Sequence, residues 1–503
     1  MPLFYKAKKL DFTAGERFVV VLNRRDAYHS NIRAGDKIRI FWQDDKGKKF
    51  KVIVVTNLTR SKVKLGEIGF YRELWHQYKV RNGELVEARF LGRPKSIIAI
   101  RKKLLGKQLD YKEIDSIVKD IVSGRIGHTE ITYFVASGFI KDYSNEELYY
   151  LTKSIAENGD VLRFRGKVVD KHSIGGLPAN RTTMIVAPII AACGLCIPKT
   201  SSRAITSPAG TADTMEVLAN VSFTVREIKK LVQKNKGCLV WGGGLNLAPA
   251  DDRVVQVSYP LGMEPYTKMV VSIMAKKVAS DVEYLVIDLP FGPTTKVPNI
   301  KVAKRIEKKF LYLGKRFGIK VSVVMSEALE PVGRGVGPAL EARDVLRVLQ
   351  QDEFRPLDLE NKSLRLAGRL LEIAGEARLG KGEGLARDIL ESGAAWRKMK
   401  AMIKSQGGKP SIKPQQLILG AFKKHLHASQ SGKVIRVDNK AIVDLCRILG
   451  APMDKKAGIY MNKRYGEEVF KGDRTLTLYA ESEERMQMAI KALGKIKVLG
   501  IKK

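Results

Sequence analysis

The chain of 503 residues is too long for one ordinary core, so its length predicts two to four domains. Its composition, 44% hydrophobic and 28% charged, is typical of a globular protein, and four cysteines are too few for a disulfide framework. The 90 basic and 53 acidic residues leave a net charge of +37, which attracts anions without selecting one class of them.

Residues 1–87 are predicted to form a small barrel-like β domain. Short β-branched or alternating runs at 17–22, 36–42 and 49–57 are separated by turn residues at 34–36 and 45–47. The N-terminus carries no apolar segment of the secretory type, so a cytoplasmic location is predicted.

From about residue 88 to residue 160 the pattern becomes helical. Residues 112–122 are amphipathic, and Ser144 followed by Glu147 is a capping signal for the next helix. These residues predict a helical lobe, which we expect segment 249–281 to join.

Strand-like and helical segments alternate between residues 161 and 425. Runs 284–289 and 321–325 are typical of strands, and 339–349 is typical of a helix. This alternation favours an α/β lobe in which a parallel or mixed sheet is covered by helices. Residues 426–503 are predicted to form a smaller α+β domain, so the fold class is α/β with domains added at both ends.

Three features of the α/β lobe resemble functional sites, but their details do not support those sites. The apolar run 184–198 is interrupted by a proline and a glycine and is too short to span a bilayer, so no membrane partner is expected. Its Cys193 and Cys196 lack a second Cys or His pair at zinc-ligand spacing, and a buried apolar pair is the simpler interpretation. The glycines of residues 333–337 do not match the G-x-G-x-x-G dinucleotide pattern and favour a tight strand-to-helix turn.

Two segments combine a cation, hydroxyl side chains and glycine: residues 171–176 (KHSIGG) and 201–216 (SSRAITSPAGTADTME). Backbone N–H groups, hydroxyls and a point charge together can hold an oxyanion. Neither segment is a Walker A loop, because no Gly-Lys-Ser/Thr closes a Gly-x4 spacing. The sequence therefore predicts phosphate binding of a kind other than that of P-loop NTPases.

These motifs resemble those of the thymidine and pyrimidine nucleoside phosphorylase family. The match includes KHSxGG at 171–176, GTxDxxE at 210–216 and SIMAKK at 272–277, and similarity extends over roughly residues 90–500. The chain is most similar to the nucleotide-cleaving branch of the family, the AMP phosphorylases. Four features indicate this branch: the added N-terminal β domain and the segments 176–183 (GLPANRTT), 199–206 (KTSSRAIT) and 241–252 (WGGGLNLAPADD).

The resemblance implies the reaction of AMP and phosphate to adenine and ribose 1,5-bisphosphate, with CMP and UMP as further candidate substrates. It implies a helical lobe facing an α/β lobe with the substrate between them, and a homodimer or larger homo-oligomer. Inorganic phosphate is the co-substrate, and neither a metal nor another cofactor is expected.

The resemblance also assigns site residues. Lys171, Ser173, Thr182 and Thr211 correspond to the residues that hold the attacking phosphate. The positions that correspond to AMP-binding residues are Gly176, Ser202, Arg203, Ala204, Ile205, Thr206, Ser207, Thr211, Ser272 and Lys296. Lys276 is a candidate contact for the base.

The donor of a proton to the leaving base is an aspartate of a Pro-Leu-x-x-Asp-Pro segment in AMP phosphorylases. Here the segment is YPLGMEP at 259–265, so Glu264 takes that place. A glutamate can act as a general acid if its pKa is raised or its hydrogen bond to the base is strong. The change leaves the choice between adenine and pyrimidine bases open.

Three other functions compete with this hypothesis. A thymidine or pyrimidine nucleoside phosphorylase would use the same scaffold. A phosphoribosyltransferase would need Mg²⁺ and an acidic metal-binding motif, and none is convincing in the sequence. The charge of +37 is also compatible with an RNA-binding protein that reuses the fold, through nonspecific attraction of nucleic acid.

Overall fold

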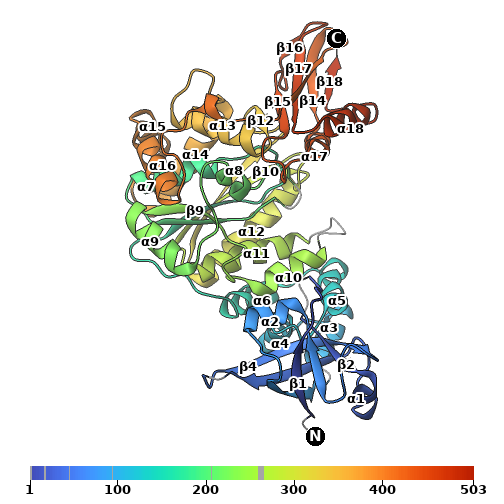
Figure 1. The fold of residues 1–503 in the computed structure, drawn as a ribbon. Coiled ribbons are helices and arrows are strands. Elements are labelled where there is room, and N and C mark those ends of the chain that lie inside the picture. Colours follow the sequence, from blue (N-terminus) through green and yellow to red (C-terminus); the bar gives the residue numbers. More distant parts are fainter. Residues whose placement is uncertain are drawn as a thin grey trace. The chain divides into compact units, whose positions relative to one another are not determined.

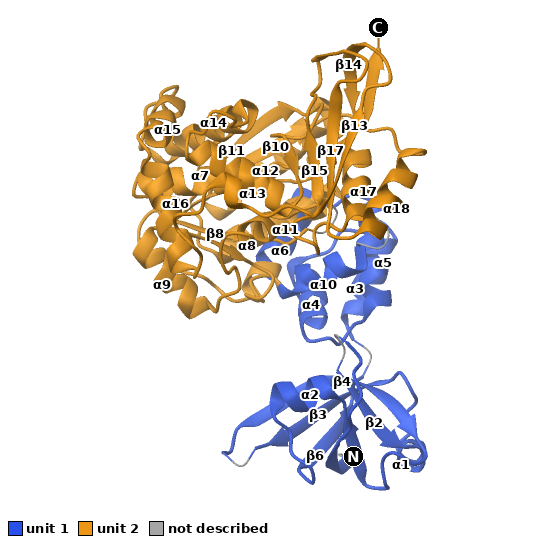
Figure 2. Cartoon of the chain, turned by 45° about the horizontal axis from the view of Figure 1, so that its top comes forward, with its two compact units in different colours: residues 1–154, 249–263 blue, residues 155–248, 264–503 orange. Residues whose placement is uncertain are grey.

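The computed structural model describes residues 3–15, 18–44, 46–92, 94–204, 207–258 and 265–502. The chain forms two compact units, residues 1–154 with 249–263 and residues 155–248 with 264–503 (Figure 2). Segment 249–281, which we expected to accompany the helical lobe, contributes helix α10 (Pro249–Ser258) to the first unit and α11 (Tyr266–Ala279) to the second. Within the described ranges, no helix has the length and apolar character needed to cross a membrane.

The first unit begins with a closed barrel whose strands follow the order β1-β5-β2-β4-β3-β6. Ile38, Ile40 and Trp42 alternate inward along β3, and closure leaves the barrel without a free strand edge. The predicted strands 17–22, 36–42 and 49–57 are confirmed as β2, β3 and β4. The elements are β1 (Leu3–Lys9), β2 (Val19–Asn23), α1 (Arg24–His29), β3 (Lys37–Gln43), β4 (Lys49–Thr59), β5 (Glu67–Phe70), α2 (Arg72–Tyr78) and β6 (Leu85–Phe90).

Beyond the barrel and its helices α1 and α2, the first unit contains α3 (Ser96–Leu104), α4 (Tyr111–Val122), α5 (His128–Ile140) and α10, together with α6 (Asn145–Glu157), which continues into the second unit. The amphipathic segment 112–122 is confirmed as α4, which buries Ile114, Ile117 and Ile121. The predicted capping signal is confirmed too. Glu147 N–H donates to Ser144 Oγ over 3.2 Å, and Ser144 N–H donates to the Glu147 carboxylate over 2.9 Å.

The second unit contains the predicted parallel sheet. Its strands are β7 (Val169–Ser173), β8 (Ile197–Ser201), β9 (Gly237–Trp241), β10 (Tyr284–Phe291) and β11 (Lys320–Glu327). Parallel pairs give the orders β11-β10-β7 and β8-β9, and a parallel bridge between Val168 and Cys196 joins the two parts. Along the chain, β8 and β9 therefore follow β7 on one side of it, and β10 and β11 are placed on its other side.

Connections between parallel strands are almost always right-handed. Because the connections of α7 and α12 run in opposite directions along the sheet, this rule places the two helices on opposite faces (Figure 1). Helix α12 is capped by Asn299, whose side chain accepts the Val302 N–H, and ends at Gly318 in the left-handed conformation. The helices are α7 (Thr183–Ala192), α8 (Thr211–Glu216), α9 (Val225–Asn235), α11, α12 (Ile300–Phe317), α13 (Pro338–Leu349), α14 (Leu357–Ala374), α15 (Gly382–Glu391) and α16 (Ala394–Ser405), followed by the 3-10 turn η2 (Pro414–Gln416).

The C-terminal residues form two small sheets, β12-β15-β17-β13 and β16-β14-β18, with α17 and α18 beside them (Figure 1). Strand β12 comes from the α/β lobe, and the boundary expected after residue 425 falls inside β13. Gly337, with φ of +117°, connects β12 to α13, and a Cβ there would meet the Ala457 carbonyl oxygen. The predicted turn at 333–337 is thus confirmed, as is the fold class. The elements are β12 (Gly335–Val336), β13 (Phe422–His427), β14 (Gly432–Val437), α17 (Asn439–Leu449), β15 (Gly458–Met461), β16 (Glu468–Val469), β17 (Arg474–Ala480), α18 (Glu483–Leu493) and β18 (Leu499–Lys502).

Candidate active site

The first predicted motif lies where the strand order reverses. Strand β7 pairs with β10 on one side and is bridged to β8 on the other, so its carboxyl end is a topological switch point. In open α/β sheets, ligands bind in the crevice outside the carboxyl ends of the strands at such a point. Lys171 and Ser173 are on the last residues of β7, and Asp288 of β10 is the register partner of Ser173.

The Lys171 ammonium is buried among hydroxyl groups. Its Nζ lies 2.5 Å from Ser173 Oγ, 2.6 Å from Thr182 Oγ1 and 3.3 Å from Thr183 Oγ1. Burial lowers the pKa of Lys171 to about 7, against the opposing effect of the Asp288 carboxylate 3.8 Å away. The predicted phosphate residues Lys171, Ser173 and Thr182 are therefore brought together around one titratable cation.

Asp288, which the sequence motifs did not indicate, organises this group. Its Oδ2 accepts hydrogen bonds from Ser173 Oγ over 2.7 Å and Asn180 Nδ2 over 2.8 Å, and Lys362 Nζ of α14 lies 3.1 Å from its Oδ1. Burial alone would raise the pKa of Asp288, but Lys362, Lys171 and the hydrogen bonds lower it to about 2. The only signal in the sequence was a carboxylate within the apolar strand 284–289, where charged residues are rare.

Gly176 and Lys296 lie against each other across the same edge of the sheet. A Cβ at Gly176 would stand 2.7 Å from the Lys296 backbone nitrogen and 2.6 Å from its Cγ, and Gly176 has φ of +83°. The Tyr266 hydroxyl at the start of α11 donates to the Lys296 carbonyl over 3.4 Å. Two residues predicted to bind AMP are thus adjacent, and glycine is required for this approach.

Arg203 of the second motif takes part in a group of charges that we call the Arg203 cluster: Arg203, Asp213, Glu216 and Lys455. The Arg203 guanidinium makes two contacts of 2.6 Å with the Glu216 carboxylate and lies over the Trp241 ring at 5.1 Å. Lys455 Nζ lies 3.1 Å from Asp213 Oδ1 and 3.0 Å from Glu216 Oε2. Lys455 comes from the C-terminal domain, and nothing in the sequence motifs indicated it.

Arg181 connects the two motifs. Its Nη1 donates to Thr211 Oγ1 over 3.0 Å and its Nη2 to the Ala209 carbonyl over 2.9 Å, while its Nε lies 2.5 Å from Glu341 Oε2. Both charged side chains are almost fully buried. Thr211, at the first position of α8, is therefore hydrogen-bonded to the side chain of Arg181, the residue that precedes Thr182 in the chain.

The remaining predicted residues divide into three groups. Ser202 and Ala204 flank Arg203, and a Cβ at Gly210 would lie 2.5 Å from the Ser202 carbonyl, so this loop packs on the start of α8. Ser207 Oγ donates to the Ala209 carbonyl over 2.8 Å. Ser272 and Lys276 are half-buried one turn apart on α11. Ile205, Thr206 and Glu264 lie outside the described residues.

A second set of buried charges surrounds Asp170, the residue of β7 that precedes Lys171. Asp170 lies 3.0 Å from Lys199 Nζ of β8 and 2.5 Å from Lys277 Nζ of α11. Burial lowers the pKa of Lys277 to about 8, although Asp170 opposes this shift. Two lysines against one carboxylate place positive charge behind the Lys171 site, which favours anionic ligands.

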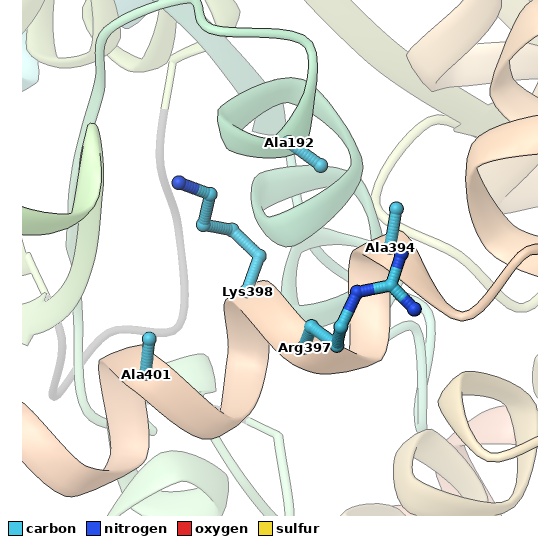
Figure 3. Close-up of a pocket in the computed structure, with 5 residues that line it drawn as sticks. All are labelled: Ala192, Ala394, Arg397, Lys398 and Ala401. Atoms are coloured by element: carbon cyan, nitrogen blue, oxygen red, sulfur yellow. The ribbon is translucent and has the colours of Figure 1, made fainter.

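A shallow hollow between the end of α7 and α16 is lined by Ala192, Ala394, Arg397, Lys398 and Ala401 (Figure 3). Helix α7 starts beyond the carboxyl end of β7 and runs back along the sheet, so Ala192 lies toward the amino ends of the strands. The hollow is therefore separate from Lys171 and Asp288.

Known proteins resemble the chain along its whole length. Family models match residues 98–159 (glycosyl transferase family, helical bundle domain), 165–396 (glycosyl transferase family, a/b domain) and 433–498 (pyrimidine nucleoside phosphorylase C-terminal domain). The AMP phosphorylase of Pyrococcus furiosus is 43% identical over 500 residues, which cover 99% of this chain and 98% of that protein. The chain belongs to the AMP phosphorylase family. The resemblance expected from the motifs is thereby confirmed.

Two further similarities agree with this family and fold. The AMP phosphorylase of Methanococcus maripaludis (strain C6) is 41% identical over 491 residues, covering 97% of this chain and 95% of that protein. The crystal structure of anthranilate phosphoribosyltransferase from Thermus thermophilus covers 61% of this chain and 99% of its own, with a TM-score of 0.50 and 19% identity. At that identity the likeness concerns the fold alone.

Proposed function

We propose that this member of the family catalyses the phosphorolysis of AMP to adenine and ribose 1,5-bisphosphate. The observation that carries the proposal is the presence of two separate cation sets near the carboxyl ends of the parallel strands. Lys171 is buried among hydroxyls at β7, and Arg203 follows β8 in a second charged cluster. A reaction between a nucleotide and phosphate must hold two phosphate groups, whereas a nucleoside phosphorylase holds one.

In the proposed reaction an oxygen of inorganic phosphate bonds to C1′ as the bond from C1′ to the base nitrogen breaks. The sugar acquires oxocarbenium character, and the bonding electrons leave with the base. The Lys171 ammonium would hold the phosphate below C1′, which supplies proximity and places negative charge near the developing cation. Glu264 would give its proton to the departing base, and the proton that the attacking phosphate releases to solvent would restore it.

Ser173 would act on the phosphate through Lys171. Its hydroxyl proton is donated to Asp288, and its oxygen accepts from the Lys171 ammonium. Thr182 and Thr211 are the hydroxyls that we assign to direct phosphate contact, with Arg203 and Lys296 assigned to the 5′-phosphate of AMP. Ser272 and Lys276 are assigned to the nucleoside part.

A substrate panel tests the proposed function. The full chain is incubated with inorganic phosphate and AMP, CMP, UMP, thymidine or uridine, and free base and sugar phosphate are quantified. We expect adenine and ribose 1,5-bisphosphate in equal amounts from AMP, and loss of both products in Lys171→Met. Turnover of thymidine without turnover of AMP would overturn the proposal in favour of a pyrimidine nucleoside phosphorylase, to which the match over residues 433–498 also refers.

A further inference from the structure

The Arg203 cluster contains two cations and two carboxylates at a partly exposed position. The side chains of Arg203, Glu216 and Lys455 are each exposed by about a third (34%, 32% and 31%), so a ligand can reach them, whereas Asp213 is buried. Asp213 Oδ2 accepts the N–H groups of Ala204 and Gly210 over 2.6 and 2.9 Å. Asp213 therefore holds both sides of the loop that carries Arg203 and cannot leave without disturbing it.

Glu216 occupies the end of the Arg203 guanidinium. It contacts Nη1 and Nη2, one oxygen to each nitrogen, in a bidentate pair. This arrangement leaves Nε–H and the second proton of Nη2, which point to one side, without a partner among the described residues. The guanidinium can therefore offer that side to a phosphate while Glu216 and Trp241 keep its orientation.

The carboxylates are a difficulty for an anion-binding site. The hydrogen bond from Arg203, with Lys455 contributing, lowers the pKa of Glu216 to about 2, so Glu216 is ionised at neutral pH. With Arg203 as the only cation, the cluster would carry a net negative charge and would repel a phosphate dianion. Lys455 removes this excess, because it lies within 3.1 Å of both Asp213 and Glu216.

The position of Lys455 is defined by its own backbone. Its carbonyl accepts the Ala339 N–H over 2.9 Å at the start of α13, which anchors the loop between α17 and β15 to the α/β lobe. The next residue, Lys456, points its ammonium to Glu481 over 3.0 Å and takes no part in the cluster. Two adjacent lysines thus have different environments, and Lys456 provides a matched control.

We propose that Lys455 is a specificity-determining residue for the 5′-phosphate of the nucleotide substrate. It acts through Asp213 and Glu216: by balancing their charge it allows Arg203 to accept a phosphate dianion without releasing Glu216. It is a positioning residue that does not contact the reacting atoms. The proposal rests on the proposed function, because it concerns the second phosphate that only a nucleotide brings.

The test compares Lys455→Met with Lys455→Arg and with the control Lys456→Met, by steady-state kinetics and by calorimetric titration with AMP. Loss of the balancing charge should raise the KM and the Kd for AMP about tenfold, with kcat and the KM for phosphate changed less than about twofold. Lys455→Arg should restore AMP binding, and Lys456→Met should behave as wild type. In the double variant Lys455→Met/Glu216→Gln, which again balances the charges, most of the affinity for AMP should return.

Several outcomes would overturn the inference. An unchanged KM for AMP in Lys455→Met would do so, as would equal rises in the KM for AMP and for phosphate. Failure of both Lys455→Arg and the double variant to recover AMP binding would show that Lys455 acts by supporting the fold alone. A wild-type chain that neither binds nor cleaves AMP would instead overturn the proposed function, and this inference with it.

Discussion

Ser173 and Asp288 are opposite each other at the last paired position of β7 and β10, and the Ser173 hydroxyl donates to Asp288 Oδ2 over 2.7 Å. The same serine oxygen accepts from the Lys171 ammonium. A chain of hydrogen bonds therefore runs from the carboxylate through the hydroxyl to the cation. The carboxylate controls both the direction of the ammonium and its affinity for a proton.

The pH dependence of phosphate use should reveal this control. If the Lys171 ammonium is the form that binds phosphate, activity is present below the pKa of Lys171, about 7 in the structure, and is lost as pH rises through it. Asp288→Asn removes the opposite charge, so this loss of kcat/KM for phosphate should begin about one pH unit lower. Lys362→Met removes a like charge that lowers the pKa of Lys171, so the loss should move to higher pH.

Measurement of kcat/KM for phosphate from about pH 5 to about pH 9, on either side of neutrality, would check both variants. Phosphate itself titrates identically with each variant, so a difference between profiles reports the protein. Shifts of both variants in the same direction would contradict the assignment.

The threonine hydroxyls around Lys171 should contribute unequally to phosphate binding. Thr182 Oγ1 lies 2.6 Å from the ammonium and Thr183 Oγ1 lies 3.3 Å from it, and both side chains are buried. Thr182→Val should raise the KM for phosphate about tenfold, since it removes a charge-assisted hydrogen bond as well as a proposed phosphate ligand. Thr183→Val preserves the side-chain shape as well as Thr182→Val does, and it should raise the KM for phosphate less. Equal effects in steady-state kinetics would exclude a special role for Thr182.

Alanine substitutions at Gly175 and Gly176 should distinguish the effect of backbone strain from the effect of a clash with Lys296. Gly175 and Gly176 have φ of +82° and +83°, so alanine costs about 1 kcal/mol or more at either position. A Cβ at Gly175 meets nothing within 4 Å, whereas one at Gly176 meets Lys296. Thermal unfolding should therefore show a loss of stability in both variants, larger in Gly176→Ala. Only Gly176→Ala should also raise the KM for AMP, and the same KM in both variants would argue against a role for Lys296 in AMP binding.

Replacing Arg181 alone, which leaves the buried Glu341 carboxylate unpaired, should lower the free energy of unfolding more than neutralising both residues. Arg181→Met leaves the Glu341 carboxylate without its cation and should destabilise the protein by about 3–5 kcal/mol. The double variant Arg181→Met/Glu341→Gln has no uncompensated charge, so it should recover part of the lost stability. Because Arg181 also holds Thr211, both variants should keep a raised KM for phosphate. Thermal unfolding and phosphate kinetics measure the two effects separately, and full recovery of both by the second substitution would contradict this division.

Local patterns determined much of the fold. The capping signal at Ser144 and Glu147, the amphipathic segment of α4 and the alternation along β3 each involve residues close in sequence, and the structure confirms them. The two phosphate-like motifs and their glycines were also recognisable, because a cation, hydroxyls and a flexible backbone must occur together to hold an oxyanion.

Only the tertiary structure decided which distant charges complete the site. Asp288 meets Ser173 across 115 residues because parallel pairing sets the register of β7 and β10, and Lys455 meets Asp213 across 242 residues because the C-terminal domain packs on α13. Sequence by itself determined the family and the fold class, and it supplied the candidate groups for phosphate binding. The order and register of the strands determined their partners, since contacts between distant segments depend on how whole elements pack and not on any local pattern.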